Sequence, residues 1–371
     1  MNFELSADQQ MLADSVDRFG RDEWPAPNRP RLLAAYGKGA PGRWKQIADL
    51  GWLALPMSQA QGGLGGSPSD IMVVAEGLGR HLVPDPFVNC GVLVAPLIGP
   101  ARTDLLEAMI EGDTRVALAL GDGDSRFDHL AVETRAEPRA GGYRLSGDKQ
   151  FVADGADADW FIVPARVSDA SAMDAGLTLF LVHRDSPGLK VERFRGMDHH
   201  RHARLQLRQV GVGGDAVLGE THGGAALLEL AVRGAIVAQC AEAVGAMDAL
   251  VAITLDYIRT RRQFGAAIGS FQAIQHRMVD MAIAAEEARS ILYRATLELA
   301  AGEDDGGRMA SAAKVRVGQS SLFVARQAVQ LHGGVGTSDE LVVSHYLKRL
   351  MMIDLTFGHV DHHRTLFAAA A

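Results

Sequence analysis

The stretch that decides the fold is residues 257–281, which read YIRTRRQFGAAIGSFQAIQHRMVDM. Two helical patterns meet in it across a short loop, residues 264–269, which carries two glycines and follows two arginines. After the loop, apolar residues recur at steps that alternate three and four, as in a helix packed nearly parallel to others in a bundle. They are Phe271, Ile274, Met278, Met281, Ala285, Ala288, Leu292, Ala295 and Leu299. Because a single helix of this kind does not fold alone, the sequence predicts partner helices elsewhere in the chain.

Two arginines, Arg261 and Arg262, stand between the first helical pattern and the loop. Cations at the C-terminal end of a helix complement its dipole, which accounts for them without any ligand. Two guanidinium groups beside a glycine-bearing loop also suit a phosphate group. Both interpretations are open at this point.

The composition is that of an intracellular globular protein with two or three structural units, since 371 residues exceed one compact core. The 37 basic and 45 acidic residues give a formal charge of -8, and no basic tract suggests nucleic acid or a membrane surface as a partner. We expect no membrane span, because charges interrupt the apolar runs, and no signal peptide at the N-terminus. Only Cys90 and Cys240 are present, which predicts a reducing, cytoplasmic location.

Periodicity divides the chain into three predicted domains. Residues 1–113 carry helix signals, among them a capping box from Ser6 to Gln9 and a helix start at Ser67-Pro68. Residues 114–222 change to a period of two and predict a β-sandwich or barrel domain. Residues 223–371 return to helix and predict a four-helix bundle. The expected fold class is therefore multidomain α+β.

Single elements can also be placed by number. We expect strands at residues 115–120, 130–134, 143–146, 160–163 and 177–182, and a solvated turn at residues 198–202. Long helices are expected at residues 225–257 and 308–331, the second of them stopped by Gly333 and Gly334. Thr337 and Glu340 predict a capping box for the next helix, and a last helix should follow Gly358.

The run R-x-Q-F-G, followed by F-Q-x-I-Q and D-M, resembles the acyl-CoA dehydrogenase family of FAD flavoproteins. The likeness covers nearly the whole chain, and it is closest to the small subunit of heteromeric, pimeloyl-CoA dehydrogenase-like enzymes. It implies an acyl-CoA dehydrogenase-like fold, FAD as cofactor and α,β-desaturation of an acyl-CoA thioester in fatty acid metabolism. It also implies an electron-transfer flavoprotein or similar acceptor. The implied assembly is a tetramer, either a homo-oligomer or an α2β2 complex with a paralogous dehydrogenase subunit.

The resemblance also implies cofactor contacts. In the family, seven positions of the C-terminal motifs reach across a dimer interface to a flavin in the neighbouring subunit. Here these positions hold Arg261, Gln263, Phe264, Gln272, Gln330, Gly333 and Gly334. The segment GDKQFVADGA at residues 147–156 resembles G-x-K-x-(W/F)-I-T-N-G, in which an aromatic residue flanks the flavin. That aromatic residue is Phe151 here.

Three positions depart from the family pattern. Aligned without a gap, the family's Y-E-G-T falls on residues 356–359, so Phe357 occupies the position of the catalytic glutamate. Some relatives place the base on the preceding helix, where this chain has Ala235, and the threonine beside the flavin is Ala153. The motif residues that in the family contact a neighbouring subunit's flavin are present here. The motif residues that contact a subunit's own flavin and substrate are replaced. This pattern predicts a subunit whose partner supplies the base.

Other interpretations stay open. Glu242 lies in a largely apolar run, where burial could raise its pKa toward that of a useful base, as a self-sufficient dehydrogenase with a displaced base would need. The plainer alternative is a glutamate that is bonded to the backbone or to an arginine. Asp361 and His359 are weaker candidates for a base. The chain could also bind FAD or acyl-CoA as a scaffold without turnover.

A metal site is the remaining alternative. The last helix carries His359, Asp361, His362 and His363, with His332 or His345 as further possible ligands. No motif of a known metal centre accompanies them, so we assign no metal.

Overall fold

The computed structural model describes residues 4–36, 41–99, 102–123, 126–167, 176–302 and 307–369. Contacts group the chain into two compact units, each of which gathers segments far apart in the sequence. The helical unit comprises residues 1–38, 68–84 and 236–371, and the sheet unit comprises residues 39–67 and 85–235. The finer division of the chain at residues 113 and 222 stays a prediction.

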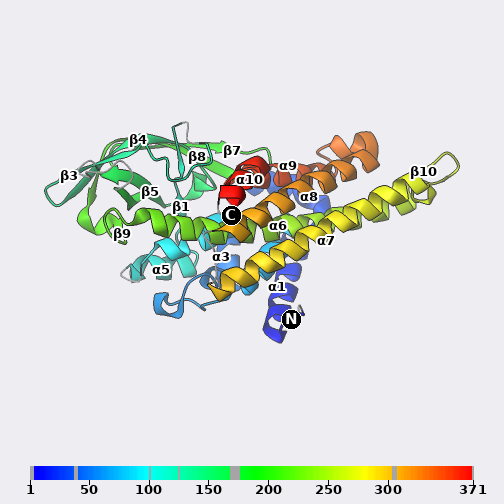
Figure 1. Ribbon diagram of the computed structural model, residues 1–371, viewed down its shortest axis with the longest axis horizontal. Helices are drawn as coiled ribbons and strands as arrows, with labels where there is room; N and C mark the ends of the chain where they lie inside the picture. The colour runs from blue at the N-terminus through cyan, green and yellow to red at the C-terminus, as the bar shows by residue number, and fades with distance from the viewer. Residues whose placement is uncertain are drawn as a thin grey trace. The chain divides into compact units, whose positions relative to one another are not determined.

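Long helices build the helical unit, as the periodicity predicts (Figure 1). They are α1 (Ala7–Glu23), α2 (Arg29–Tyr36), α4 (Pro68–Arg80), α6 (Gly224–Thr260, which begins in the sheet unit), α7 (Gln272–Ala301), α8 (Arg308–His332), α9 (Val342–Leu355) and α10 (Val360–Ala369). Helices α6 and α7 run side by side to a short hairpin of β10 (Arg262–Gln263) and β11 (Ala266–Ala267) (Figure 1). The predicted seam of α7 is buried from Met278 to Ala295, where α7 packs on α8.

Most predicted helix ends are confirmed, and one is wrong. Ser6 and Gln9 form the predicted capping box of α1, and α4 begins at Pro68. The predicted cap at Thr337 is wrong, because α9 begins only at Val342. Residues 333–337 continue beyond α8 as a 3₁₀ turn, and the Thr337 hydroxyl donates to the carbonyl of Gly334 at 2.9 Å within that turn.

Helix α6 is more apolar than the sequence analysis expects. By length and composition alone it could cross a membrane, since an 18-residue window has a mean hydropathy of 1.6. Of that window, 72% is buried inside the structure. The core helix of a globular fold passes the same test, so the window is weak evidence for a membrane span.

Within the described residues, the sheet unit holds one sheet of nine strands. The strands are β1 (Val116–Leu118), β2 (Gly121–Asp122), β3 (Arg135–Arg139), β4 (Gly142–Val152), β5 (Trp160–Val167), β6 (Leu177–His183), β7 (Leu189–Arg195), β8 (Arg201–Gly213) and β9 (Val217–Leu218). The path runs β7-β8-β4-β3-β5-β6-β9, with β1 beside β5 and β2 beside β4. Strand β5 pairs in parallel with β1 and β3, and the other pairs are antiparallel. Two helices, α3 (Pro41–Asp49) and α5 (Thr103–Ile110), complete the unit.

The strand expected at residues 130–134 is wrong, since β3 begins only after it. The N–H groups of Glu133 and Thr134 donate to Oδ2 of Asp122 at 3.1 and 2.9 Å. Carbonyl groups within the same segment accept from the guanidinium of Arg166. Side chains thus satisfy four of these backbone groups, and the carbonyl of Thr134 accepts from the N–H of Arg166 at 2.8 Å, so the segment needs no continuous strand pairing.

The turn expected at residues 198–202 exists between β7 and β8, but the prediction that it is solvated is wrong. Asp198, His200 and His202 are buried there. The reason is a buried partner in the turn after β4: Nδ1 of His200 lies 2.9 Å from Oδ1 of Asp154. A polar turn is thus held inside the unit by its own hydrogen bonds.

Helices α4 and α6 cross at two glycines. A Cβ atom on Gly79 would lie 1.9 Å from the backbone oxygen of Glu242, and one on Gly245 would lie 1.9 Å from the backbone oxygen of Glu76. Both clashes are with main chain, which cannot rotate out of the way as a side chain can. The two glycines therefore set the distance between these helices.

Replacing Gly245 by alanine is expected to lower the free energy of unfolding by about 1–3 kcal/mol, as overpacking of a close contact does. Gly234→Ala on the same helix is the matched control, because a Cβ atom there would meet no atom within 4 Å. The control should gain up to about 1 kcal/mol from helix propensity. Denaturant unfolding of both variants measures the difference, and equal effects would contradict the close crossing.

Candidate functional site

The ends of α6 and α8 meet at one end of the helical bundle. The hydroxyl of Tyr257 donates to the carbonyl of His332 at 3.3 Å, and the two rings stack with their centroids 4.2 Å apart. The N–H of Arg261 donates to the carbonyl of Tyr257, and Gly333 directly follows His332. The structure therefore brings the two predicted cofactor motifs of the helical unit to the same end of the bundle.

The predicted cofactor contacts at this end point away from the protein core. The residues Arg261, Gln263, Phe264, Gln272, Gln330, Gly333 and Gly334 are all exposed. Phe264 is 94% exposed, and its ring touches only that of Phe271 edge-on, at 6.4 Å between centroids, among the described aromatic residues. Within the part of the chain that is described, the guanidinium of Arg261 has neither a hydrogen bond nor an ion pair. The loop is therefore available to a ligand or to a second chain.

The two glycines after α8 fit a phosphate-bearing cofactor. Gly333 has a φ of +66°, a conformation that favours glycine. A Cβ atom on Gly333 or Gly334 would meet no atom within 4 Å. Packing inside the described chain thus leaves open space beside this backbone, from which an anion can approach the N–H groups. With Arg261 and Gln330 nearby, the donor set suits the pyrophosphate of a dinucleotide such as FAD.

Phe151, the other predicted cofactor contact, lies on β4 in the sheet unit. It is 36% exposed, and its ring contacts those of His202 and Phe194, with centroids 4.6 and 5.9 Å apart. Ala153 follows in the next turn, where it offers no hydroxyl group. The ring of Phe151 is thus held in place, but Ala153 cannot provide the hydroxyl group that the resemblance leads us to expect two residues later.

A buried hydrogen-bond cluster, which the sequence analysis missed, fixes this end of β4. Oδ2 of Asp154 accepts from Nδ2 of Asn89 at 2.7 Å, Oδ1 contacts His200, and the N–H of Asp154 donates to Nδ1 of His202 at 3.2 Å. Burial raises the pKa of Asp154, but the adjacent histidines and Asn89 outweigh it, so that pKa lies below its ordinary value. The cluster holds the ring of His202 against Phe151.

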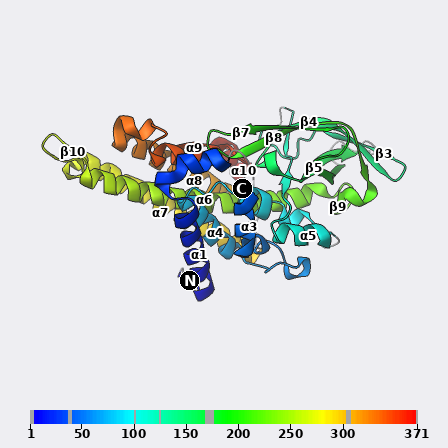
Figure 2. The ribbon, with the colours of Figure 1, turned by 180° about the vertical axis from the view of Figure 1, so that it is seen from behind.

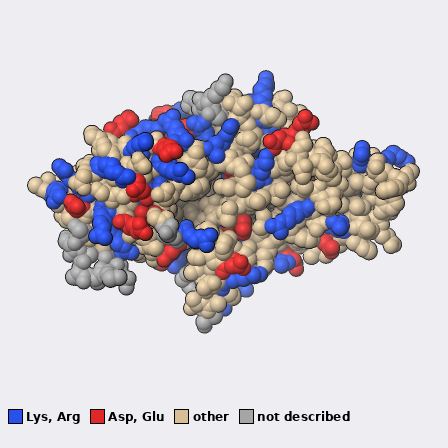
Figure 3. Space-filling view, turned by 90° about the horizontal axis from the view of Figure 1, so that it is seen from above, with Lys and Arg blue, Asp and Glu red and all other residues tan. Residues whose placement is uncertain are grey.

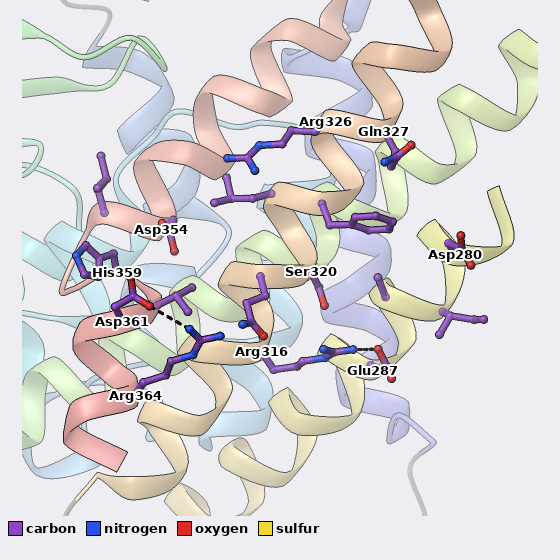
Figure 4. Close-up of a pocket in the computed structure, with 17 residues that line it drawn as sticks. Asp280, Glu287, Arg316, Ser320, Arg326, Gln327, Asp354, His359, Asp361 and Arg364 are labelled. Atoms are coloured by element: carbon purple, nitrogen blue, oxygen red, sulfur yellow. Dashed lines mark hydrogen bonds and ion pairs between the residues drawn. The ribbon is translucent and has the colours of Figure 1, made fainter. Parts of the chain in front are cut away.

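A cavity of about 1000 Å³ opens between α7, α8, α9 and α10 (Figure 4). Leu355 and His359, which flank Phe357 in the sequence, are among its lining residues. Acidic and basic side chains alternate on its walls. They are Asp280, Glu287, Asp354, Asp361, Arg316, Arg326, Arg364 and His359. Arg364 donates to Asp361 at 3.0 Å, and Arg316 forms an ion pair with Glu287 (Figure 4). Much of the charge in the cavity is therefore neutralised within it.

Phe357 sits at the turn between α9 and α10 with a φ of +59°, which is unusual for a bulky residue. Its carbonyl contacts Nε2 of His363 at 2.9 Å, and Nδ1 of the same ring lies 3.1 Å from Oγ of Ser311. Phe357 is not among the described residues that line the cavity. Its ring cannot take up a proton.

The cavity contains one acid that sequence reasoning missed, Asp354. Its Oδ1 atom is buried and has no hydrogen-bond partner in the described part of the chain. Burial raises the pKa of Asp354 above its ordinary value. Gly318 leaves room for this carboxylate, since a Cβ atom there would lie 2.7 Å from Oδ1. These are the conditions of a candidate general base, and the sequence shows them only as one aspartate in the apolar run 350–355.

Glu242, the displaced base weighed from the sequence, is engaged elsewhere. Arg349 donates to it through Nε at 2.5 Å and through Nη2 at 2.8 Å, and both side chains are buried. A bidentate pair of this kind directs both carboxylate oxygens at the guanidinium rather than at a substrate. The plainer alternative, a glutamate bonded to an arginine, describes the structure.

The histidines of the last helix make local contacts. His359 Nδ1 accepts from the N–H of His362 at 3.1 Å, and His363 bridges Ser311 and Phe357. Among the residues that the structure describes, no three His, Cys, Asp or Glu side chains are grouped so that they could hold a metal ion. The metal hypothesis therefore has no supporting geometry.

Comparison with known proteins places this chain. The models of the acyl-CoA dehydrogenase N-terminal, middle and C-terminal domains match residues 6–99, 117–210 and 225–371. The chain is 27% identical over 380 residues to the L-prolyl-(peptidyl-carrier protein) dehydrogenase of a Serratia species, a match covering 99% of this chain and 97% of that protein.

Two solved structures are similar over almost their whole length. PigA with FAD and proline has a TM-score of 0.90 at 25% identity and covers 100% of this chain and 98% of its own. A variant of the Tcur3481-Tcur3483 steroid ACAD has a TM-score of 0.86 at 28% identity, covering 98% of this chain and 97% of its own.

The family models and the fold define a flavin-dependent dehydrogenase. The chain belongs to the acyl-CoA dehydrogenase family. Its fold is the three-domain fold of that family, its cofactor is FAD, and its class is that of oxidoreductases acting on CH–CH donors. The predictions of fold class, cofactor and enzyme class are confirmed.

Proposed function

We propose that this chain is one subunit of a heteromeric acyl-CoA dehydrogenase, an α2β2 tetramer in which a paralogous subunit carries the catalytic base. The observation that carries the proposal is a contrast within the helical unit. Arg261, Phe264 and Gln330 are exposed at the bundle end, where their side chains can contact a neighbouring subunit. Phe357, in contrast, stands where the resemblance to the family places the catalytic glutamate, and its side chain cannot act as a base.

Each side of the proposed shared site has a task. Arg261 would pair with the pyrophosphate of the partner's flavin, and the backbone N–H groups at Gly333 and Gly334 would donate to the same phosphates. Phe264 would be covered by the partner, which accounts for an apolar ring that is 94% exposed in this chain. When bound, FAD would supply the acceptor for the hydride that leaves the substrate's β-carbon.

The substrate is proposed to be an acyl thioester, in which the carbonyl acidifies the neighbouring C–H bond. The base on the partner would remove that α-proton, since Phe357 has no group that can. Acyl-CoA is the expected form, in fatty acid metabolism, with an electron-transfer flavoprotein or a similar acceptor. Because one relative carries a peptidyl-carrier protein in its name, a carrier-protein thioester belongs in the substrate panel.

A self-sufficient dehydrogenase is the second candidate, favoured by Asp354. Unlike Glu242, this acid has a buried oxygen without a hydrogen-bond partner among the described residues, and it faces a cavity. A scaffold that binds FAD without turnover is the third candidate.

Turnover decides among the three candidates. The chain alone, the partner alone and both together are assayed on a panel of acyl-CoA and carrier-protein thioesters with an artificial electron acceptor. Activity only in the mixture supports the heteromeric enzyme. Activity of the chain alone that falls about 10²–10⁴-fold in Asp354→Asn, but not in Asp361→Asn, would replace it by the self-sufficient enzyme. Inactivity of every combination would favour the third candidate, a scaffold that binds FAD without turnover.

Phe357→Glu is expected to give little or no activity to the chain alone. Ala153 still lacks a hydroxyl group beside the expected flavin position, and the φ of +59° at residue 357 is as unfavourable for glutamate as for phenylalanine. The same assay checks this prediction. A variant that turns over alone would mean that this chain holds a complete substrate pocket and lacks only the base.

The location and the remaining partners are proposed from composition. Cys90 and Cys240 are free and buried, as expected for a protein of the reducing cytoplasm. On the face shown in Figure 3, basic and acidic side chains are interspersed, which supports neither nucleic acid nor an anionic membrane as a partner.

A further inference from the structure

A second, smaller cavity lies in the helical unit. Its volume is about 220 Å³, and its walls come from the C-terminal end of α1, the start of α2, the end of α4, α6 and the start of α9. The N-terminal helices, in blue, lie next to α9 in Figure 2. None of the residues predicted to touch FAD or substrate is among the described residues that line it. It is therefore separate from the site proposed above.

Arg29 lines this cavity and is only 4% exposed. Its Nε and Nη1 atoms are buried and have no hydrogen-bond partner in the described part of the chain. Burial lowers the pKa of Arg29 to about 10. The guanidinium carbon lies 5.6 Å from the centroid of the Trp24 ring, a contact that stabilises a cation but leaves the N–H donors in its plane unused. Buried donors of this kind call for an acceptor.

The other charged groups on the walls do not supply that acceptor. Arg21, Arg80 and His81 also line the cavity, and none of its described lining residues is acidic. Arg80 and His81 already contact Asp17, at 3.3 and 3.0 Å. Arg29 is thus a buried cation for which the described residues provide no carboxylate, in a cavity whose charge is positive.

The remaining walls are apolar and limit the size of a ligand. Trp24, Ile253, Val342 and Tyr346 contribute aromatic and branched side chains. A cavity of about 150 Å³ accommodates benzene, so 220 Å³ has room for a ring of that size together with a carboxylate group. A guanidinium presents two parallel N–H groups, which match the two oxygens of a carboxylate.

We propose that this cavity binds a small organic carboxylate, with its two oxygens on the guanidinium of Arg29 and its apolar body against Trp24 and Tyr346. The site serves a ligand other than FAD and the thioester substrate. It does not depend on the heteromeric assembly, because every described residue that lines the cavity lies in the helical unit of this chain.

Calorimetric titration of the purified protein, with its flavin and any partner that it retains, tests the proposal with benzoate as the probe. We expect one benzoate per chain, with no change in flavin absorbance. Benzamide has nearly the same shape without the charge, and inorganic phosphate has charge without the apolar body. Both should bind about 10- to 100-fold more weakly than benzoate, as expected when a charge-assisted contact or its apolar support is lost.

Variants separate the cavity from other sites. Arg29→Met should weaken benzoate binding by about 10- to 100-fold. Arg31→Met is the matched control on the exposed side of α2 and should leave binding unchanged. If Arg29→Met does not fold, Val342→Phe decides, because it fills the cavity while Arg29 remains and should abolish binding.

Four results would overturn the proposal. They are the absence of saturable binding up to millimolar benzoate, unchanged binding in Arg29→Met or Val342→Phe, binding of phosphate as tight as that of benzoate, and a flavin spectral shift on adding benzoate. The last of these would place benzoate in the flavin pocket instead.

Discussion

Arg349→Ala is expected to lower the free energy of unfolding by about 3–5 kcal/mol, because it leaves the carboxylate of Glu242 buried without its partner. The pair is buried on both sides, with side chains 9% and 8% exposed, and its two hydrogen bonds are short. Denaturant unfolding with the flavin content held equal measures the loss. The exposed pair of Arg294 and Glu298 supplies the control, since Arg294→Ala should cost less than about 1 kcal/mol.

A double variant sharpens this prediction. Replacing Arg349 by methionine and Glu242 by leucine removes both charges together, so most of the lost stability should return. If Arg349→Ala costs no more than Arg294→Ala, the pair does not hold Glu242, and this glutamate becomes available again as a displaced base.

Arg261→Ala is expected to weaken FAD binding in the assembled enzyme by roughly 10- to 150-fold, which corresponds to about 1.5–3 kcal/mol for a charge-assisted hydrogen bond. The neighbouring Arg262→Ala is the control, because its guanidinium contacts the carbonyl of Gly265 in the same hairpin at 3.4 Å. Gln330→Ala should act in the same direction but less, since its amide is neutral. Titration of the flavin-free assembly with FAD measures all three variants.

Equal flavin affinities of the wild type and Arg261→Ala would remove the phosphate role of the hairpin. Equal losses in Arg261→Ala and Arg262→Ala would indicate that the hairpin itself is disturbed. Only a loss specific to Arg261 agrees with a cation that has no partner among the described residues of its own chain and acts on a cofactor.

The long helices could be predicted because their signals are local and repeated. The α7 seam, the capping box at Ser6 and the end of α8 at Gly333 each depend on side chains within a few residues. The wrong predictions concern segments whose structure depends on side chains far away in the sequence. Thr134 bonds to Asp122 instead of joining a strand, and the turn that contains His200 is buried because Asp154 lies against it.

The candidate site likewise contains residues that a local motif predicts and residues that it does not. The bundle-end residues were predicted from a motif, and the contact of Tyr257 with His332 brings their two segments together. No local pattern distinguishes Asp354, Glu242 or Arg29 from other charged residues on helices. Whether such a group is paired depends on helices far away in the sequence. For Glu242 the structure supplies a partner, whereas for Oδ1 of Asp354 the described residues supply none.

The most direct test of the shared site is the flavin content of this chain purified alone and with its paralogous partner. We predict less than one FAD per chain when this chain is purified alone, because Ala153 weakens its own flavin site while Arg261 acts on the flavin of a neighbouring subunit. Co-purification with the partner should restore one FAD per heterodimer, with turnover appearing at the same time. A homo-oligomer with one FAD in every subunit, active without any partner, would contradict it.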